Sequence, residues 1–96
     1  KENNLMQNQP EILLADIFYY VALPFAEDDE GSLVAGTAEE FQSASTAIRR
    51  AETLSRTSGA IGAVAFTRSG DPMIGEFSDA VILKAFGNVP ADLSTL

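Results

Sequence analysis

Residues 43–59, with the sequence SASTAIRRAETLSRTSG, decide the fold. Ser43 is a candidate N-cap, because its hydroxyl can accept a hydrogen bond from a free amide of the first turn. Gly59 is a candidate stop, because glycine adopts the left-handed conformation without a Cβ clash. Between them, apolar residues recur at helical spacing and form one stripe. The stripe comprises Ala44, Ala47, Ile48, Ala51 and Leu54. The stretch predicts the one clear helix of the chain.

Four strands are expected to pack against this helix. They span residues 17–25, 33–42, 60–68 and 76–86. The pair Glu39-Glu40 marks the second strand as an edge, because charges on an edge discourage pairing with other chains. The turn formers of residues 69–75 connect the third and fourth strands. We therefore predict an α+β domain of two-layer ββαββ order, with an antiparallel sheet and one main helix packed on one face.

The alanine content of the stripe suggests that the helix lies close to the sheet. We predict that the helix packs on the strands that hold Val21, Val64 and Val81, and the sequence leaves the choice of sheet face open. The helix residues expected in this contact are Ala47, Ile48, Ala51 and Leu54. Gly62, in the third strand, is expected to permit a close approach of the helix or a bend. It does not indicate a dinucleotide site, because that fingerprint needs a strand, a glycine loop and then a helix.

The length and composition predict one folded domain. A chain of 96 residues can bury one modest core, and its 46% hydrophobic content argues against disorder. Residues 1–10 are polar and are predicted to form an N-terminal arm, whereas residues 11–96 are predicted to form a single α+β domain. Met6 is either an internal residue or a native initiator, and the sequence leaves both open.

The charge and side-chain chemistry narrow the function classes. The chain has 6 Lys+Arg against 14 Asp+Glu, and its net charge of −8 repels phosphate groups, so we predict no nucleic-acid and no membrane partner. The absence of Cys and His removes thiol chemistry and the commonest metal ligand and general base. We predict a cytoplasmic protein. The apolar run of residues 12–26 is too short to span a bilayer as a helix.

The acidic segment Glu27-Asp28-Asp29-Glu30-Gly31 has two interpretations. One is a calcium loop of the EF-hand type. With Gly31 as the sixth residue, that loop would need Asp at its first position and Glu at its twelfth, where the chain has Ala26 and Thr37. The other is a solvated hairpin loop with glycine at a positive φ. The mismatch at both ends favours the hairpin loop.

Arg68, Asp71, Glu76 and Asp79 flank the connector and are the candidate ligand-binding residues. Such carboxylates could hold a divalent cation through oxygen ligands. They could instead pair with Arg68 and fix the turn, since Asp before Pro is a standard turn former. The structural role is favoured, because nothing supplies a nucleophile and a base together. We predict no catalytic residue, no metal ligand and no cofactor.

The arginines of the helix also have two interpretations. Arg49, Glu52 and Arg56 cluster at i, i+3 and i+4 spacing, which favours a solvated face with weak ion pairs. The alternative is a patch for an anion or an acidic partner. A nucleic-acid-associated regulator using Arg49, Arg50 and Arg56 is a weaker alternative. Lys84 lies in an apolar strand and is expected to face solvent rather than to act as a desolvated amine.

Three segments carry a resemblance to known sequences: AFTRSGDP at 65–72, GEFSDAVIL at 75–83 and FGNVP at 86–90. The chain resembles a group of short bacterial proteins whose function is uncharacterised, and the likeness runs from about residue 17 to residue 93. The resemblance implies a small, self-contained bacterial domain. It implies no activity, cofactor or catalytic residue.

The apolar character of both strand faces leads to a hypothesis about assembly. A half-exposed antiparallel strand should alternate apolar with polar residues, but the first, third and fourth strands are apolar on both faces. One helix covers one face only. We therefore predict a non-enzymatic protein-interaction or structural module that acts as a homo-oligomer, namely a homodimer that buries aromatic residues of the first strand. An unknown protein partner is a further expectation. The alternative is a small-ligand or metal-assisted enzyme that uses the acids near residues 69–75.

Overall fold

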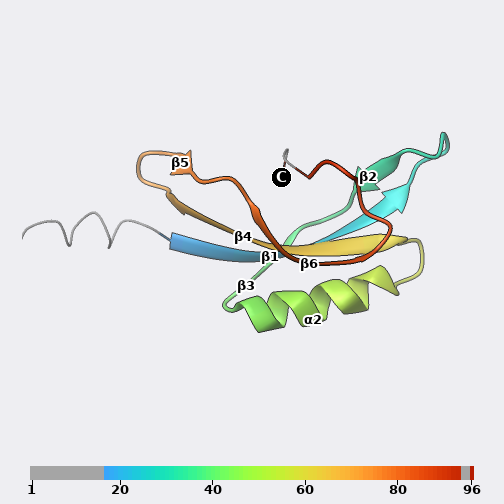
Figure 1. The fold of residues 1–96 in the computed structure, drawn as a ribbon, viewed down its shortest axis with the longest axis horizontal. Helices are drawn as coiled ribbons and strands as arrows, with labels where there is room; N and C mark the ends of the chain where they lie inside the picture. Colours follow the sequence, from blue (N-terminus) through green and yellow to red (C-terminus); the bar gives the residue numbers. More distant parts are fainter. Residues whose placement is uncertain (1–16, 94–95) are drawn as a thin grey trace, which may run out of the picture.

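The computed structural model describes residues 17–93 and 96, which form one helix and six strands. The elements are β1 (Ile17–Glu27), β2 (Leu33–Ala35), β3 (Glu39–Phe41), α2 (Ala44–Ser55), β4 (Gly62–Asp71), β5 (Glu76–Phe77) and β6 (Val81–Gly87). The strands form an antiparallel sheet, and α2 lies on one face of it (Figure 1). The predicted α+β class is confirmed. The arm predicted at residues 1–10 lies outside the described residues.

Each of the two outer strands predicted from the sequence is divided in two. The predicted strand 33–42 is β2 and β3, which both pair with β1. The break faces Pro24, whose carbonyl accepts a hydrogen bond of 2.8 Å from the Gly36 amide. The nitrogen of Pro24 has no hydrogen to return, so the ladder cannot continue regularly past it.

The predicted strand 76–86 is likewise β5 and β6, which both pair with β4. At the break, the Ser78 hydroxyl accepts a hydrogen bond of 3.0 Å from the Ser69 amide, while the Ser78 amide donates to the Ser69 carbonyl at 2.8 Å. A side chain thus replaces part of the ladder. The order of elements is therefore βββαβββ rather than the simple ββαββ.

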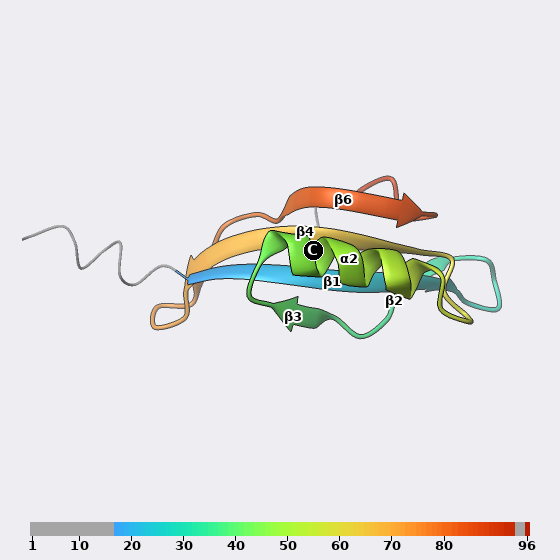
Figure 2. The same ribbon diagram turned by 90° about the horizontal axis from the view of Figure 1, so that it is seen from below.

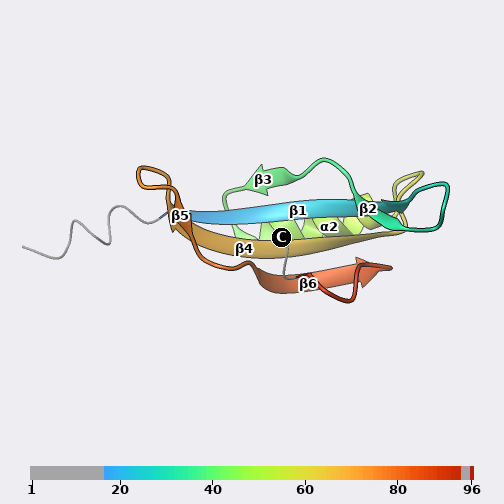
Figure 3. The same cartoon turned by 90° about the horizontal axis from the view of Figure 1, so that it is seen from above.

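β1 and β4 form the centre of the sheet. They pair from Ile17 opposite Gly70 to Phe25 opposite Gly62. β2 and β3 lie beside β1, and β5 and β6 lie beside β4 (Figures 2 and 3). The pairing of β4 with β6 contains a β-bulge, since Ala65 pairs with Lys84 and Phe66 with Ile82. Leu83 is the extra residue of this bulge.

The helix begins as predicted and ends earlier. The Ser43 hydroxyl accepts a hydrogen bond of 3.3 Å from the Thr46 amide, which confirms Ser43 as the N-cap. The helix ends at Ser55, and a short turn then leads to Gly59, whose φ of 92° is in the left-handed region. Gly59 has the predicted conformation, but it reverses the chain after the helix rather than ending the helix itself.

The structure shows which face of the sheet the helix covers. Its predicted stripe is correct, because Ala47, Ala51 and Leu54 are buried. They form one core with small residues of the two central strands, namely Ala22, Ala63 and Ala65. The helix thus packs on β1, β4 and β6, the strands that hold Val21, Val64 and Val81, as predicted. The valines themselves do not meet it, because Val21 and Val64 lie on the other face and Val81 is exposed. An alanine stripe approaches a sheet most closely where the sheet also presents alanines.

The second core lies on the face that α2 does not cover. It consists of Val21, Leu23, Phe25, Val64 and Phe66. After β6 the chain turns back over this face, and Val89, Leu93 and Leu96 pack against the core. Figure 1 shows the C-terminus on the side of the sheet opposite α2, and Figure 3 shows it over the middle of β1 and β4. The C-terminal segment thus covers part of the sheet face that α2 leaves open.

Gly62 marks the point where this segment leaves the sheet. The Asn88 amide donates a hydrogen bond of 2.9 Å to the Ile61 carbonyl. A Cβ placed on Gly62 would collide with the backbone of Asn88. The expected close approach at Gly62 is therefore present, and it is made by residue 88 rather than by the helix. Within the described residues, no helix has the length and hydropathy needed to cross a bilayer.

Candidate functional site

A groove about 390 Å³ in volume lies on the sheet face opposite α2. We name it the Arg68 groove, and it is lined by Tyr19, Val21, Ala38, Glu40, Phe66, Arg68 and Phe77. Its walls come from β1, β3, β4 and β5. The groove therefore depends on the strand register and does not arise from any single segment.

The register places these side chains together. Val21 pairs with Glu40 on one side and with Phe66 on the other, and Tyr19 pairs with Arg68. Directly paired residues of antiparallel strands project from the same face. Residues two apart on a strand also share a face, so all of these side chains lie on the face opposite α2.

Phe77 closes one end of the groove. It pairs with Gly70, and a Cβ on Gly70 would collide with the Phe77 ring. The glycine therefore lets the ring lie across the strand, where it contacts Tyr19 with 5.9 Å between ring centroids and an interplanar angle of 52°. Tilted pairs of this kind are favourable for aromatic rings.

Among the described residues, Arg68 is the one cation that lines the groove. Its guanidinium carbon lies 5.9 Å from the centroid of the Phe66 ring, which is within the range of a cation–π contact. Its Nε atom is buried, yet it has no hydrogen-bond partner among residues 17–93 and 96. Buried polar atoms in proteins nearly always have a partner, so this nitrogen is an unusual feature.

A second feature is an exposed apolar end of the molecule, where β1 begins and β4 turns into β5. We name it the hairpin-end patch, and its members are Ile17, Phe18, Met73, Ile74 and Phe77, with exposed fractions of 43%, 64%, 89%, 65% and 49%. The register places Ile17 and Phe77 on one face, because both pair with Gly70. Phe18 pairs with Ser69 and projects from the other face, and Met73 and Ile74 lie in the turn at the same end of the sheet. Phe77 belongs to both the patch and the groove.

The structure separates the four candidate ligand-binding residues. Asp71 pairs with Glu76, and both project from the face opposite to that of Arg68, because side chains alternate along β4. Asp71 also shapes the turn: its Oδ1 accepts from the Met73 amide at 2.9 Å, and its carbonyl accepts from the Gly75 amide at 2.9 Å. Asp79 is exposed in the segment between β5 and β6. Of the four, Arg68 alone lines the groove.

The acidic loop before β2 has the features of a hairpin turn. The Asp28 Oδ1 atom accepts hydrogen bonds from the amides of Glu30 and Ser32, both at 2.9 Å. Gly31 has a φ of 83°, as the hairpin interpretation requires. In the part of the chain that the structure describes, no group of three or more acidic side chains is arranged to hold a metal ion.

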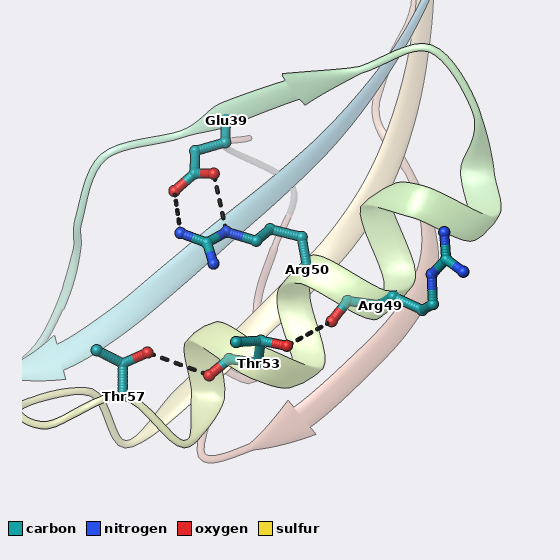
Figure 4. Close-up of polar contacts among 5 residues, drawn as sticks. All are labelled: Glu39, Arg49, Arg50, Thr53 and Thr57. Atoms are coloured by element: carbon teal, nitrogen blue, oxygen red, sulfur yellow. Dashed lines mark hydrogen bonds and ion pairs between the residues drawn. The ribbon is translucent and has the colours of Figure 1, made fainter.

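Two of the helix arginines are paired with acids. The Arg50 guanidinium binds the Glu39 carboxylate through two hydrogen bonds of 2.9 and 3.2 Å, which join α2 to β3 (Figure 4). Hydrogen bonding and charge attraction by Glu39 raise the pKa of Arg50 above its ordinary value. Arg56 pairs with Glu52 one turn away. The Arg49 side chain extends away from Glu39 and from the Arg50 guanidinium, so these two arginines do not form one basic patch (Figure 4).

Sequence reasoning identified Arg68 but not the residues around it. Tyr19 and Phe66 were assigned to apolar faces, and Phe77 was seen only as part of a strand. The available signal was Gly70, since a glycine within a strand often marks a place where another group crosses closely. In the comparisons with known proteins, no family model, curated protein or solved structure matches the chain.

Proposed function

We propose that the protein is a non-enzymatic interaction module that works as a homodimer joined through the hairpin-end patch. The observation that carries the proposal is the gathering of large exposed apolar side chains at one end of the sheet. Single exposed apolar residues are ordinary on a soluble protein, whereas several that gather at one end of the molecule favour an interaction surface. Phe18, the most exposed aromatic residue of the patch, supplies the aromatic burial expected from the first strand.

Charge favours a second copy as the occupant of this patch. The chain carries a net charge of −8, so two copies repel each other over most of their surface. The patch itself contains no ionisable side chain. Contact between two copies through it therefore removes few charged groups from water. Asp71 and Glu76 flank the patch and would form part of a polar rim, as is usual for interfaces. A two-fold dimer is the commonest closed solution for identical chains.

The chemistry of the chain supports a non-enzymatic role. The sequence has no His and no Cys, and Asp71 is occupied in shaping the turn before β5. The alternative, a metal-assisted or small-ligand enzyme using the acids near residues 69–75, stays a prediction. Calorimetry that found micromolar affinity for calcium or magnesium would favour that alternative over the module.

Light scattering after size exclusion at micromolar concentration tests the assembly. We expect a mass of twice 10.2 kDa for the wild type. Phe18→Asp and Ile74→Asp place a charge in the patch and should give monomers, because an unpaired charge is costly in an apolar contact. Val34→Asp changes an exposed apolar residue on β2, outside the patch, and should remain dimeric. A monomeric wild type, or loss of the dimer in Val34→Asp alone, would refute the proposal.

A further inference from the structure

The Arg68 groove has an unsatisfied cation at an apolar surface. Arg50 and Arg56 have carboxylate partners, whereas Arg68 makes no ion pair with any residue that the structure describes. Its Nε atom is buried and lacks an acceptor. A buried donor without an acceptor has lost its hydrogen bonds to water and has formed none within the protein, which costs free energy. Binding of a ligand that supplies an acceptor to this arginine is therefore favourable.

The surroundings of Arg68 are mostly apolar and aromatic. Phe66 lies under the guanidinium, and the tilted pair of Tyr19 and Phe77 forms the wall beside it. The groove volume of about 390 Å³ is at the small end of the range for small-molecule sites. Such a site accommodates a ligand with a ring or short chain that stacks on aromatic residues and with one polar group that reaches the guanidinium.

The charges select the kind of polar group. A guanidinium matches a carboxylate, because its planar donors can form two parallel hydrogen bonds with the two oxygens. Of the residues that the structure describes, Glu40 is the one acid that lines the groove, and it is exposed. Its negative charge, together with the net charge of −8, disfavours a dianion such as phosphate. A single negative charge is balanced by Arg68 alone.

We propose that the Arg68 groove binds a small monocarboxylate that has an aromatic body. The carboxylate pairs with the Arg68 guanidinium and supplies the acceptor for Nε. The aromatic body packs against Tyr19, Phe66 and Phe77. This inference goes beyond the proposed dimer, because the groove shares only Phe77 with the hairpin-end patch and binding does not require self-association.

Binding of phenylacetate and of its neutral analogue phenylacetamide to the wild-type chain tests the proposal. Titration by NMR should show saturable binding of phenylacetate in the millimolar range or tighter, with shifts of the amides of Tyr19, Phe66 and Phe77. Phenylacetamide has nearly the same shape but lacks the charge, and it should bind about tenfold more weakly, because hydrogen bonds to charged groups are the stronger ones. Equal binding of the two probes, or no saturable binding of phenylacetate, would overturn the proposal.

Matched arginine variants give a second test. Arg68→Gln should weaken phenylacetate binding about tenfold or more, whereas Arg49→Gln removes the same charge from the exposed helix surface and should leave binding unchanged. Equal losses in the two variants would show a general charge effect and overturn the site. Ile74→Asp disrupts the patch outside the groove, so its phenylacetate binding should persist even as a monomer. This separates failure of the groove from failure of the proposed dimer.

Discussion

The two faces of the sheet bury apolar surface in different ways. On the α2 face, alanines of the helix meet alanines of β1 and β4, and Ala22, Ala47, Ala51, Ala63 and Ala65 are all fully buried. On the other face, larger side chains such as Val64 and Phe66 are covered by an extended C-terminal segment, and the Arg68 groove stays open beside them. Small side chains allow a rigid helix to seal one face, whereas an extended segment over large side chains leaves part of the other face available for binding.

The largest expected effect comes from a charge in the sealed face. Ala51→Asp would bury a carboxylate that has no partner, and this should cost several kcal/mol, which is comparable to the total stability of a small domain of about 5–15 kcal/mol. Chemical unfolding measures the loss. Thr53→Asp, at an exposed position of the same helix, is the control and should unfold almost as the wild type does. An unshifted curve for Ala51→Asp would contradict the helix placement.

The next largest loss of stability should come from truncating Leu54 or Leu93. These two variants compare the two faces directly, because Leu54 lies on the α2 face and Leu93 lies on the other. Leu54→Ala creates a cavity under the helix and should cost about 2–5 kcal/mol. Leu93 is only half-buried in the C-terminal segment, so Leu93→Ala should cost about 1–2 kcal/mol. Met73→Ala, at a fully exposed apolar residue, serves as the control for both. Urea unfolding that ranked Leu93 above Leu54 would mean that the C-terminal segment, not the helix, dominates the stability.

Gly62 tests how the covering segment leaves the sheet. Gly62→Ala forces a methyl group against the Asn88 backbone, which cannot rotate away, so a loss of about 1–3 kcal/mol is expected. Gly31→Ala is the comparison, because the added methyl group meets nothing within 4 Å and only the positive φ of 83° opposes it. Thermal unfolding should therefore rank Gly62→Ala as the more destabilising change. If Gly31→Ala were the more destabilising variant, the Asn88 backbone could not lie against Gly62.

The smallest effect is expected at the ion pair between Glu39 and Arg50. The pair is partly exposed, and water and salt screen most of its attraction. Glu39→Gln should lower the melting temperature slightly at low salt and not measurably at 1 M salt, at which screening acts within about 3 Å. Glu40→Gln, on the neighbouring residue that faces the groove, should show no such salt dependence. A large, salt-independent loss in Glu39→Gln would show that the pair holds α2 to the sheet.

The sequence was sufficient to predict the helix, its cap and its buried stripe, because helical periodicity and the Ser43 hydroxyl act locally. It was not sufficient to choose the sheet face that the helix covers. β1 alternates two apolar sets, so hydrophobicity alone does not distinguish Ala22 from Val21. Side-chain size does distinguish them, since the alanine stripe of α2 fits the alanines of the sheet.

The candidate site was less predictable than the fold. Arg68 was identified because it is a cation beside a turn, and Asp71, Glu76 and Asp79 were grouped with it on sequence proximity alone. In a strand, neighbours in sequence project to opposite faces, and the residues that share a face with Arg68 come from other strands. Tyr19 is its direct partner although 48 intervening residues separate the two in sequence. Register, which depends on the whole sheet, decides such groupings.

The bulge at Leu83 has a consequence for solubility. β6 is an outer strand with the sequence VILKAFG, and among the described residues nothing pairs with its outer side. A flat apolar strand in that position would act as a template for other chains and lead to aggregation. The extra residue bends the strand, and Lys84 follows it with a charge, so the two together interrupt the template. We therefore expect the bulge and Lys84 together to oppose association of chains through the free edge of β6.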